Sequence, residues 1–467
     1  MTSESLVLDE RRGGVEMDVK VMTTPGLGDK SYVFAHDGVA IVVDPQRDID
    51  RFTSVLDELG VAPRYILETH LHNDYVSGGR HLAGETGAEL VLPAGAGTKF
   101  AYLPAFHNED MDAGPFQIRP LHTPGHTPEH VSYLVVIDDV PIAVFSGGSL
   151  LVGSAGRTDL LGVDRATSLV RLQYQSVMRL AELPGEAALY PTHGAGSFCT
   201  ASEAGGTTST IGDELKTNPV LQYPDVEAFA AGQLSGLPPY PSYYAYMGPI
   251  NLAGPDPYHP EPVPELTPSE IQEAMDQGVM IIDGRYKTSF AEAHIPGSWG
   301  MELGSDFATW IGWLLPFNAP LALILEEGES LEEARTALAR IGFEDVRGVT
   351  WGLEAWIEEG RPTMSHLTMT ARQFIEEGNG SRQVVDVRAP TEWVDGTFAG
   401  SVLCHLPDLI ETTPEELDKN APVYLGCTTG HRASIAAGVL SDRGYQPVVL
   451  TGASLLGVIM LTTGAEA

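Results

Sequence analysis

The stretch Thr69-His70-Leu71-His72-Asn73-Asp74-Tyr75 follows the apolar run Tyr65-Ile66-Leu67 and precedes Val76-Ser77-Gly78-Gly79. This placement predicts a loop that leaves a buried strand. The loop carries two imidazoles and a carboxylate close together, and these side chains are common ligands of zinc and iron. The stretch therefore predicts a metal site at the end of a strand.

Two later stretches carry further histidines in the same kind of place. His122-Thr123-Pro124-Gly125-His126-Thr127-Pro128-Glu129-His130 surrounds a Pro-Gly turn between two predicted strands, 109–121 and 131–145. Pro191-Thr192-His193 directly follows the apolar residues Ala188-Leu189-Tyr190. The chain thus has three histidine-bearing loops, each predicted to lie at the end of a strand.

This ordered set of loops, together with the turn Gly156-Arg157-Thr158-Asp159, resembles the metallo-β-lactamase fold superfamily, in particular its glyoxalase II and persulfide dioxygenase branch. The resemblance covers roughly the first half of the chain and implies an αββα sandwich. The sequence pattern agrees, because it predicts early strands and two segments with helical spacing. The predicted strands are 17–21, 31–35 and 39–43, and the predicted helices are 49–59 and 167–183.

By family position, the metal ligands that the resemblance implies are His70, His72 and His126, which leave one coordination place open. Two positions depart from the family pattern. Tyr75 stands where the family usually has a histidine, and Gly148 stands where it usually has an aspartate that bridges two metals or completes an iron site. We therefore expect at most one divalent ion, Fe(II) or Zn(II), and the alternative is a degenerate, metal-free site.

A secondary metal or substrate site is implied less completely. Asp74 and His193 remain from it, and His130 or His122 could replace the missing histidine. An aspartate restored at position 148 is expected to strengthen metal binding, because it returns a carboxylate to the site.

Charge and cysteine content limit the class of protein. The chain has 467 residues, with 27 basic and 63 acidic side chains and a formal net charge of −36. Nucleic acids and anionic membranes repel such a surface, so we expect neither as a partner. No apolar run is long enough to span a bilayer, and residues 1–16 lack a secretory core. Three cysteines do not suggest a disulfide framework, and we expect a cytoplasmic, bacterial protein.

From residue 217 to 264 the composition shifts toward proline and tyrosine, which predicts a linker. Two similar segments follow, each with a helix and a buried strand that ends in Asp-x-Arg, at Asp283-Gly284-Arg285 and at Asp386-Val387-Arg388. This internal repeat resembles a pair of rhodanese domains, which implies α/β folds on parallel sheets. The predicted domains are 1–250, 262–362 and 366–467.

The later copy carries Gly426-Cys427-Thr428-Thr429-Gly430-His431-Arg432 between a predicted strand and a predicted helix. Backbone N–H groups and the helix dipole at such a place stabilise a thiolate, and Arg432 adds a cation. The pattern Cys-x-x-Gly-x-Arg matches the sulfurtransferase loop of rhodaneses, which implies that Cys427 and Arg432 are catalytic. The remaining residues of this persulfide- and anion-binding loop are Thr428, Thr429, Gly430 and His431.

The aligned stretch of the earlier copy, Leu325-Glu326-Glu327-Gly328-Glu329-Ser330, has no cysteine. Two glutamates stand where an anion would bind, so we expect this copy to be catalytically silent. The remaining cysteines are Cys199, close to the third histidine loop, and Cys404 in a strand-like run. Cys199 is either a functional thiol or a packing residue, and Cys404 is predicted to lie in the core.

The order of domains resembles the persulfide dioxygenase–rhodanese fusions of bacterial sulfide detoxification. In that family the first domain oxidises a thiol persulfide with Fe(II) and O₂, and the rhodanese transfers sulfane sulfur. The alternatives are a zinc hydrolase of thioesters similar to glyoxalase II, fused to a rhodanese, or a metal-free scaffold with only the rhodanese active. The expected partners are small-molecule thiols and persulfides, thiosulfate and, in a homo-oligomer, further copies of the chain.

Overall fold

The computed structural model describes residues 5–12, 15–201, 205–377, 382–451, 455 and 457–459. The chain forms two compact units, Met1–His259 with Ala339–Gly342, and Pro260–Leu338 with Phe343–Ala467. The outer ends of the predicted first and last domains, residues 1–4 and 460–467, lie outside the described residues. Within the described part of the chain, no helix is both long and apolar enough to cross a membrane.

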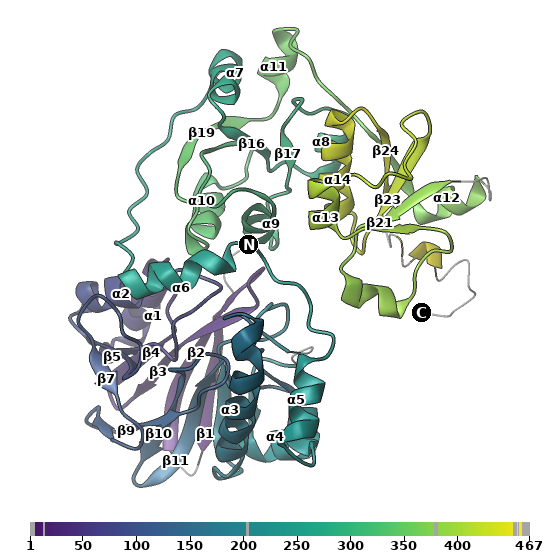
Figure 1. Cartoon of the computed structure of the whole chain (residues 1–467). Helices are drawn as coiled ribbons and strands as arrows, with labels where there is room; N and C mark the ends of the chain where they lie inside the picture. Colours follow the sequence, from purple (N-terminus) through teal and green to yellow (C-terminus); the bar gives the residue numbers. More distant parts are fainter. Residues whose placement is uncertain are drawn as a thin grey trace. The chain divides into compact units, whose positions relative to one another are not determined.

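The first unit contains two stacked β-sheets with helices on their outer faces (Figure 1). The larger sheet has the order β1 (Ser5–Arg12), β2 (Val15–Thr24), β3 (Asp29–His36), β4 (Val39–Val43), β5 (Ala62–Leu67), β6 (Glu89–Pro93), β7 (Leu103–Ala105). The smaller sheet has the order β15 (Ser209–Thr210), β14 (Ala188–Pro191), β11 (Val140–Gly147), β10 (Val131–Ile137), β9 (Gln117–His122), β8 (Met111–Asp112). A separate hairpin consists of β12 (Leu150–Leu151) and β13 (Ser154–Ala155).

The helices of this unit lie outside the sheets. The larger sheet is covered by α1 (Asp50–Leu59) and α2 (Gly79–Thr86), whose Phe52 and Leu82 pack on Val42 and Ile66. The smaller sheet is covered by α3 (Val163–Ala181), α4 (Ile211–Thr217), the 3-10 helix η1 (Pro219–Gln222) and α5 (Val226–Leu234). A further helix, α6 (Tyr244–Ala253), follows. The predicted αββα sandwich is therefore confirmed.

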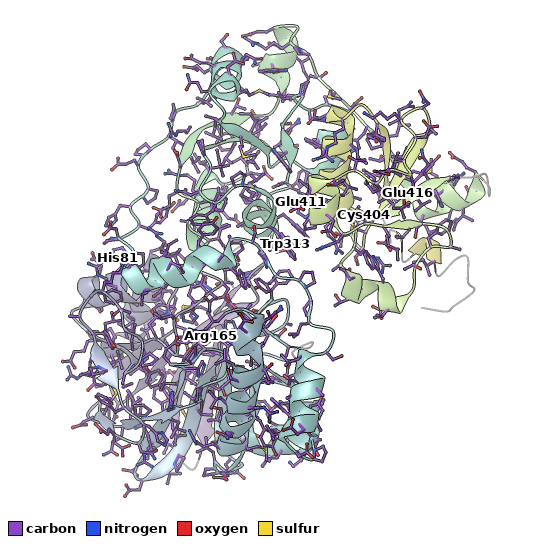
Figure 2. The ribbon with its side chains drawn as sticks, in the orientation of Figure 1. His81, Arg165, Trp313, Cys404, Glu411 and Glu416 are labelled. Carbon is purple, nitrogen blue, oxygen red and sulfur yellow. The ribbon has the colours of Figure 1, made fainter. Side chains whose placement is uncertain are left out.

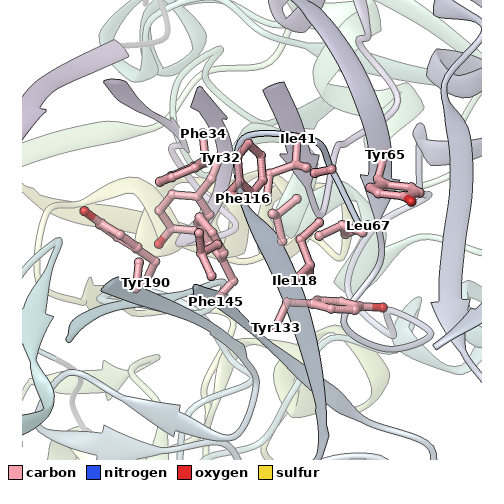
Figure 3. Close-up of a cluster of buried hydrophobic side chains, with 14 of the residues drawn as sticks. Tyr32, Phe34, Ile41, Tyr65, Leu67, Phe116, Ile118, Tyr133, Phe145 and Tyr190 are labelled. Carbon is pink, nitrogen blue, oxygen red and sulfur yellow. The ribbon is translucent and has the colours of Figure 1, made fainter. Parts of the chain in front are cut away.

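Aromatic and aliphatic side chains fill the space between the two sheets (Figure 3). The ring centroid of Phe145 from β11 lies 5.3 Å from that of Tyr32 and 6.3 Å from that of Phe34, both from β3. Alternate residues of each strand enter this layer, because successive β side chains point to opposite faces. Burying one such side chain contributes about 1.5–3 kcal/mol. This packing fixes the position of one sheet on the other, and with it the positions of the loops at their edge.

Parallel pairing brings the histidine loops to one edge. Strand β4 pairs in parallel with β5, and Val43 lies opposite Leu67. Strand β11 pairs in parallel with β14, and Gly147 lies opposite Pro191. Parallel strands end at the same edge of a sheet. The loop that begins at Asp44 therefore starts beside the one that begins at Glu68, and the loop that begins at Gly148 starts beside the one that begins at Thr192.

The second unit contains two parallel sheets. The first sheet has the order β17 (Trp299–Gly300), β16 (Met280–Asp283), β18 (Leu321–Leu325), β19 (Val346–Trp351). The second sheet has the order β20 (Leu367–Thr370), β24 (Gln446–Thr451), β23 (Pro422–Gly426), β21 (Gln383–Asp386), β22 (Val402–Leu403). The parallel α/β architecture predicted from the repeat is confirmed.

Short helices connect these strands. The earlier copy contains α7 (Pro268–Asp276), α8 (Lys287–Glu292), α9 (Phe307–Leu314), α10 (Leu331–Arg340) and α11 (Glu354–Glu358). The later copy contains α12 (Ala371–Glu376), the 3-10 helix η2 (Pro390–Asp395), α13 (Leu406–Glu411) and α14 (His431–Asp442). Helices α7 and α12 both begin with a capping box, at Thr267 with Glu270 and at Thr370 with Gln373. This reciprocal cap satisfies backbone N–H groups at the helix start, and its repetition matches the internal repeat of the sequence.

Candidate functional site

Three buried histidines from three different loops lie together at the edge of the sandwich. His70 follows β5, His126 follows β9 and His193 follows β14. One potential ligand atom of each lies within 4.8 Å of the others. Their ring centroids are 4.9 Å apart for His70 and His126, 5.1 Å for His126 and His193, and 5.5 Å for His70 and His193.

Each of these imidazoles is held by its Nδ1 atom. The Nδ1 atoms lie 2.9 Å from Thr69 Oγ1 for His70, 2.7 Å from the Arg157 carbonyl for His126, and 2.9 Å from Asp29 Oδ1 for His193. The Nε2 atom of all three has no hydrogen-bond partner among the described residues. Metal-binding histidines commonly have this arrangement, with one nitrogen on a protein acceptor and the other on the ion.

The electrostatics of this cluster also suit a metal ion. Burial, reinforced by the neighbouring histidines, lowers the pKa of His70 and of His126 well below the ordinary value of 6.5. Burial likewise lowers the pKa of His193, although Asp74 opposes the shift. Neutral imidazoles are the form that binds metals. The residues present therefore fit a divalent transition metal.

His72 has a different environment. Its Nε2 atom lies 3.1 Å from Glu68 Oε2, 3.3 Å from Asp44 Oδ1 and 3.0 Å from the Tyr75 hydroxyl. Burial disfavours the charged imidazole, but the carboxylates of Asp44 and Glu68 outweigh it and raise the pKa of His72 well above 6.5. Tyr75, which replaces the usual family histidine, thus becomes a hydrogen-bond partner of His72.

The predicted ligand set of His70, His72 and His126 stays a prediction. The structure places potential ligand atoms together in three overlapping groups, of which the first joins His70 and His126 to His193. The groups are His70, His126, His193; His72, Asp74, His193; and Asp44, Glu68, His72. The sequence analysis did not single out Asp44 and Glu68 as site residues. A signal was present, because Asp44 directly follows a predicted strand and Glu68 directly follows an apolar run.

Asp74 and His193, assigned from the sequence to a secondary site, lie next to one further buried acid, Asp29. Burial raises the pKa of Asp29 and of Asp74 to about 7, and the charge of Asp29 further raises the pKa of Asp74. The thiol of Cys199 lies 3.4 Å from Asp74 Oδ2, to which it donates, and burial raises the pKa of this thiol well above 9.0. Cys199 is thus a buried, protonated thiol in this network.

Neither His130 nor His122 belongs to the groups of potential ligand atoms. His130 Nε2 accepts a hydrogen bond from the Gly148 N–H at 2.9 Å, and its Nδ1 lies 3.0 Å from Thr123 Oγ1. His122 is exposed, with its Nε2 atom 3.2 Å from the Pro128 carbonyl. His130 therefore holds the loop at Gly148 in place.

The cysteine loop of the second unit begins where β23 ends. Cys427 is buried, and the Gly430 N–H donates to its Sγ atom at 3.1 Å. Gly430 has φ +88, which permits the tight return of the chain before α14 begins at His431. Thr428 and Thr429 are exposed, whereas burial lowers the pKa of the partly buried His431.

Arg432 lies beside the thiol in a network that includes Glu392 from η2. Its Nη2 atom donates to Glu392 Oε1 at 2.8 Å and to Thr428 Oγ1 at 3.0 Å. Burial opposes ionisation of Glu392, but Arg432 outweighs it and lowers the pKa of Glu392 to about 2. Glu392 was not predicted as a site residue, because it lies far from the loop in the sequence.

The corresponding loop of the earlier copy supplies its own anion. It connects β18 to α10, and the Glu326 N–H donates to Glu329 Oε2 at 2.7 Å. The Glu329 carboxylate thus already binds a backbone N–H group of this loop, in which a persulfide would have to be held. This contact gives a physical reason for the predicted silence of this copy.

Cys404 does not lie in the core, where the sequence predicted it. It is half-buried and lies near the carboxylates of Asp408 and Glu416. Figure 2 labels Cys404 and Glu416. Burial and these two carboxylates raise the pKa of Cys404 to about 11. Its strand β22 ends at Leu403, so the alternation that would bury the next side chain does not continue.

Family models match both parts of the chain. The metallo-beta-lactamase superfamily matches residues 25–193, and the rhodanese-like domain matches residues 267–359 and 370–454. The chain is a fusion of a metallo-β-lactamase domain with two rhodanese-like domains. The histidine cluster belongs to the first, and the Cys427 loop belongs to the last.

Two curated relatives match the metallo-β-lactamase domain. The human mitochondrial persulfide dioxygenase ETHE1 is 30% identical over 188 residues, which are 39% of this chain and 66% of the relative. The hydroxyacylglutathione hydrolase of Hahella chejuensis is 30% identical over 177 residues, which are 37% of this chain and 65% of the relative. The chain thus spans slightly less than two thirds of the length of these relatives.

A solved structure extends the likeness into the second unit. The metallo-beta-lactamase from Staphylococcus aureus subsp. aureus COL has a TM-score of 0.65 and 29% sequence identity. The comparison covers 72% of this chain and 99% of that chain. This share exceeds the metallo-β-lactamase domain alone, so the fold similarity includes part of the rhodanese-like region.

In the metallo-β-lactamase domain, Gly148→Asp is expected to weaken metal binding, contrary to the sequence-based expectation. A Cβ atom at position 148 would lie 2.3 Å from Cδ2 of His126, a distance that real Cβ contacts do not show. The new side chain would displace the His126 imidazole and lower Zn²⁺ affinity by about 10- to 100-fold, as losses of ligand orientation do. Calorimetric titration with Zn²⁺ measures this, and affinity equal to or above wild type would contradict it.

In the active rhodanese-like domain, the Glu392–Arg432 pair is expected to stabilise the fold down to acidic pH. The pKa of Glu392 is lowered in the folded state from 4.5 to about 2, so its contribution is complete above pH 4.5 and is lost as the pH falls through about 2. Unfolding free energies measured between pH 6 and 2 should fall less steeply for Glu392→Gln than for wild type. Parallel curves for the two proteins would show that the pair does not stabilise the fold.

Proposed function

We propose that the chain is an enzyme of sulfur metabolism in which Cys427 carries sulfane sulfur as a persulfide. The observation that carries this proposal is the buried thiol at the start of α14, with the Gly430 N–H on its Sγ atom and Arg432 beside it. Backbone donors and a helix N-terminus favour the thiolate, which is the nucleophilic form of cysteine. The match to the rhodanese-like domain model supports the same reaction class.

The transfer takes place in two steps that conserve atoms and charge. The Cys427 thiolate attacks the outer sulfur of thiosulfate, a sulfur–sulfur bond forms to Cys427, and the old sulfur–sulfur bond breaks to release sulfite. A second thiolate then attacks the outer sulfur of the Cys427 persulfide and leaves with it, which restores the Cys427 thiolate. Small-molecule thiols, their persulfides and thiosulfate are the proposed substrates.

The surrounding residues hold the anions of both steps. The Gly430 N–H faces the sulfur, and Arg432 offers a guanidinium to the sulfonate or persulfide. Glu392 fixes that guanidinium through two contacts, and Thr428 adds a third. Arg432 is therefore held in position before substrate arrives, which lowers the cost of ordering it.

For the metallo-β-lactamase domain we propose a persulfide dioxygenase-like role on the same class of sulfur compounds. The similarity to persulfide dioxygenase ETHE1 and the buried histidine cluster support this role. Bound iron would supply O₂ chemistry, whereas bound zinc would supply an activated water. The similarity to a hydroxyacylglutathione hydrolase favours thioester hydrolysis as a second candidate. We further propose a cytoplasmic, homo-oligomeric protein of bacterial sulfide detoxification.

Mass spectrometry tests the sulfurtransferase proposal directly. Incubation of the full chain with thiosulfate should add one sulfur atom, which cyanide or dithiothreitol should remove. Peptide mapping should place this sulfur on Cys427. An added sulfur on Cys199 or Cys404, with Cys427 unmodified, would overturn the assignment. Metal analysis of the purified chain separates the two candidate roles of the first domain, because iron supports the dioxygenase and zinc the hydrolase.

A further inference from the structure

We propose that Lys287, in the earlier rhodanese-like copy, determines which sulfur donors the Cys427 loop accepts, by favouring the dianion thiosulfate over singly charged donors. The residue belongs to the copy that has no cysteine in its own loop, so the silent copy completes the site of the active one. This inference deepens the proposed sulfurtransferase function and rests on it.

Helix α14, which follows the Cys427 loop, packs against the earlier copy. It contacts α8 and β17 of that copy (Figure 1). A Cβ atom added to Gly438, within α14, would lie 3.1 Å from Cζ of Phe290 in α8. At the end of α14, Asp442 Oδ1 accepts from the Gly297 N–H at 2.9 Å. The two copies are therefore in contact along this helix.

Lys287, the first residue of α8, lies against the glycine that also holds the thiol. A Cβ atom added to Gly430 would lie 3.9 Å from both Cδ and Cε of Lys287, an ordinary van der Waals distance. The N–H of the same glycine donates to Cys427 Sγ at 3.1 Å. The Lys287 side chain is 32% exposed, so a small anion that enters the loop from solvent can reach its ammonium group.

His431, the first residue of α14, is influenced by this lysine and by Arg432 together. Burial lowers the pKa of His431, and the charges of Asp306 and Glu302 oppose the shift. The charges of Lys287 and Arg432 lower it further. The imidazole is therefore neutral at pH 7, and the cations that act on this point of the loop are Lys287 from one copy and Arg432 from the other.

Three negative charges meet when thiosulfate reacts. The Cys427 thiolate brings one and thiosulfate brings two, and the products, a persulfide anion and sulfite, carry the same three. Arg432 is already paired with Glu392 through two contacts, so part of its charge is cancelled. A second cation at the loop therefore matters most for a dianionic donor, because the Coulomb energy is proportional to the charge of the donor.

Lys287 is itself held by a carboxylate, which tunes this effect. Its Nζ atom donates to Glu302 Oε2 at 2.9 Å. This contact uses one of the three N–H donors of the ammonium group. Glu302 thus positions the lysine and at the same time weakens its attraction for an anion, so loss of either residue should change donor selectivity in opposite directions.

Two donors of different charge test the proposal. Thiosulfate is a dianion, whereas benzenethiosulfonate is a monoanion that gives up its outer sulfur in the same way and releases benzenesulfinate. The full chain is assayed with each donor and with cyanide as acceptor. Lys287→Met should lower kcat/KM by about 10-fold for thiosulfate and by about 3-fold for benzenethiosulfonate. Lys287→Arg should restore most of the loss, and the difference between the donors should shrink at high salt.

Glu302→Gln and a matched lysine control exclude a merely structural role. Glu302→Gln should raise kcat/KM for thiosulfate by about 3-fold, because the charge of Lys287 is no longer partly cancelled. The control is Lys419→Met, since Lys419 donates to the Arg443 carbonyl beyond the other end of α14. It removes the same charge and should change neither donor. An equal loss for both donors in Lys287→Met, a fall in Glu302→Gln or the same selectivity change in Lys419→Met would overturn the proposal.

Sulfur loading separates failure of this inference from failure of the sulfurtransferase proposal. At saturating thiosulfate, mass spectrometry should find one added sulfur on Cys427 in the wild-type chain and in Lys287→Met, because the nucleophile is the same in both. No added sulfur in the wild-type chain would overturn both proposals. Loading in both proteins with unchanged donor selectivity would overturn only the role of Lys287.

Discussion

Cys427→Ser is expected to abolish sulfur loading and to lower the rate of sulfur transfer from thiosulfate to cyanide by at least about a thousandfold. A serine hydroxyl stays protonated near neutral pH and forms no persulfide. The loop N–H groups and Arg432 would still bind the anion, but no bond to sulfur could form. The measured quantities are the added mass per chain and the rate of thiocyanate formation.

The matched control for this experiment is Cys404→Ser in the same domain. The thiol of Cys404 is half-buried, and its pKa is raised to about 11, so it contributes little thiolate at neutral pH. Sulfur loading and transfer should be unchanged in this variant. Because Glu326 and Glu329 occupy the loop of the earlier copy, activity that persists in Cys427→Ser would also contradict the predicted silence of that copy.

Arg388→Met is expected to lower the unfolding free energy of the second unit by about 3–5 kcal/mol, the cost of breaking a buried ion pair. Arg388 and Asp386 are both fully buried, with Nε 3.0 Å from Oδ1 and Nη2 2.8 Å from Oδ2. Methionine fills much of the space but leaves the Asp386 carboxylate unpaired. The midpoint of urea-induced unfolding, followed by circular dichroism, measures the loss.

The same substitution should also reduce sulfur transfer, because Arg388 supports the segment that holds Arg432. Its guanidinium donates to the carbonyls of Glu392 at 3.1 Å and Gly396 at 2.6 Å. Without these contacts η2 is less well fixed, and the Glu392 carboxylate no longer positions Arg432. We therefore expect transfer activity to fall even at urea concentrations well below the unfolding transition.

A matched control exists within the chain. Asp345 and Arg347 have the same Asp-x-Arg spacing, but the Arg347 side chain is 59% exposed. An exposed ion pair contributes about 0–1 kcal/mol, so Arg347→Met should have little effect on unfolding. If the two methionine variants lost equal stability, burial of the Arg388 pair would not be its source.

The sequence was sufficient for features that depend on contiguous residues. The Asp-x-Arg turns, the capping boxes and the strand–Cys427–helix order each involve neighbours along the chain, whose relative positions the backbone geometry restricts. The histidine loops were predictable in the same way, because each follows an apolar strand. The internal repeat supported the prediction of two rhodanese-like domains, because a pattern that occurs twice in one chain is less easily produced by chance.

The tertiary structure decided which atoms of those residues are available. A histidine has two nitrogens, and its ring orientation depends on acceptors that arrive from other strands. For His72 these acceptors are Asp44, Glu68 and Tyr75, and for His193 they are Asp29 and Asp74. Asp44 comes beside Glu68 only because β4 and β5 pair in parallel. Glu392 likewise reaches Arg432 through the fold of the sheet. Such choices depend on contacts between segments far apart in the chain, and sequence spacing alone does not contain them.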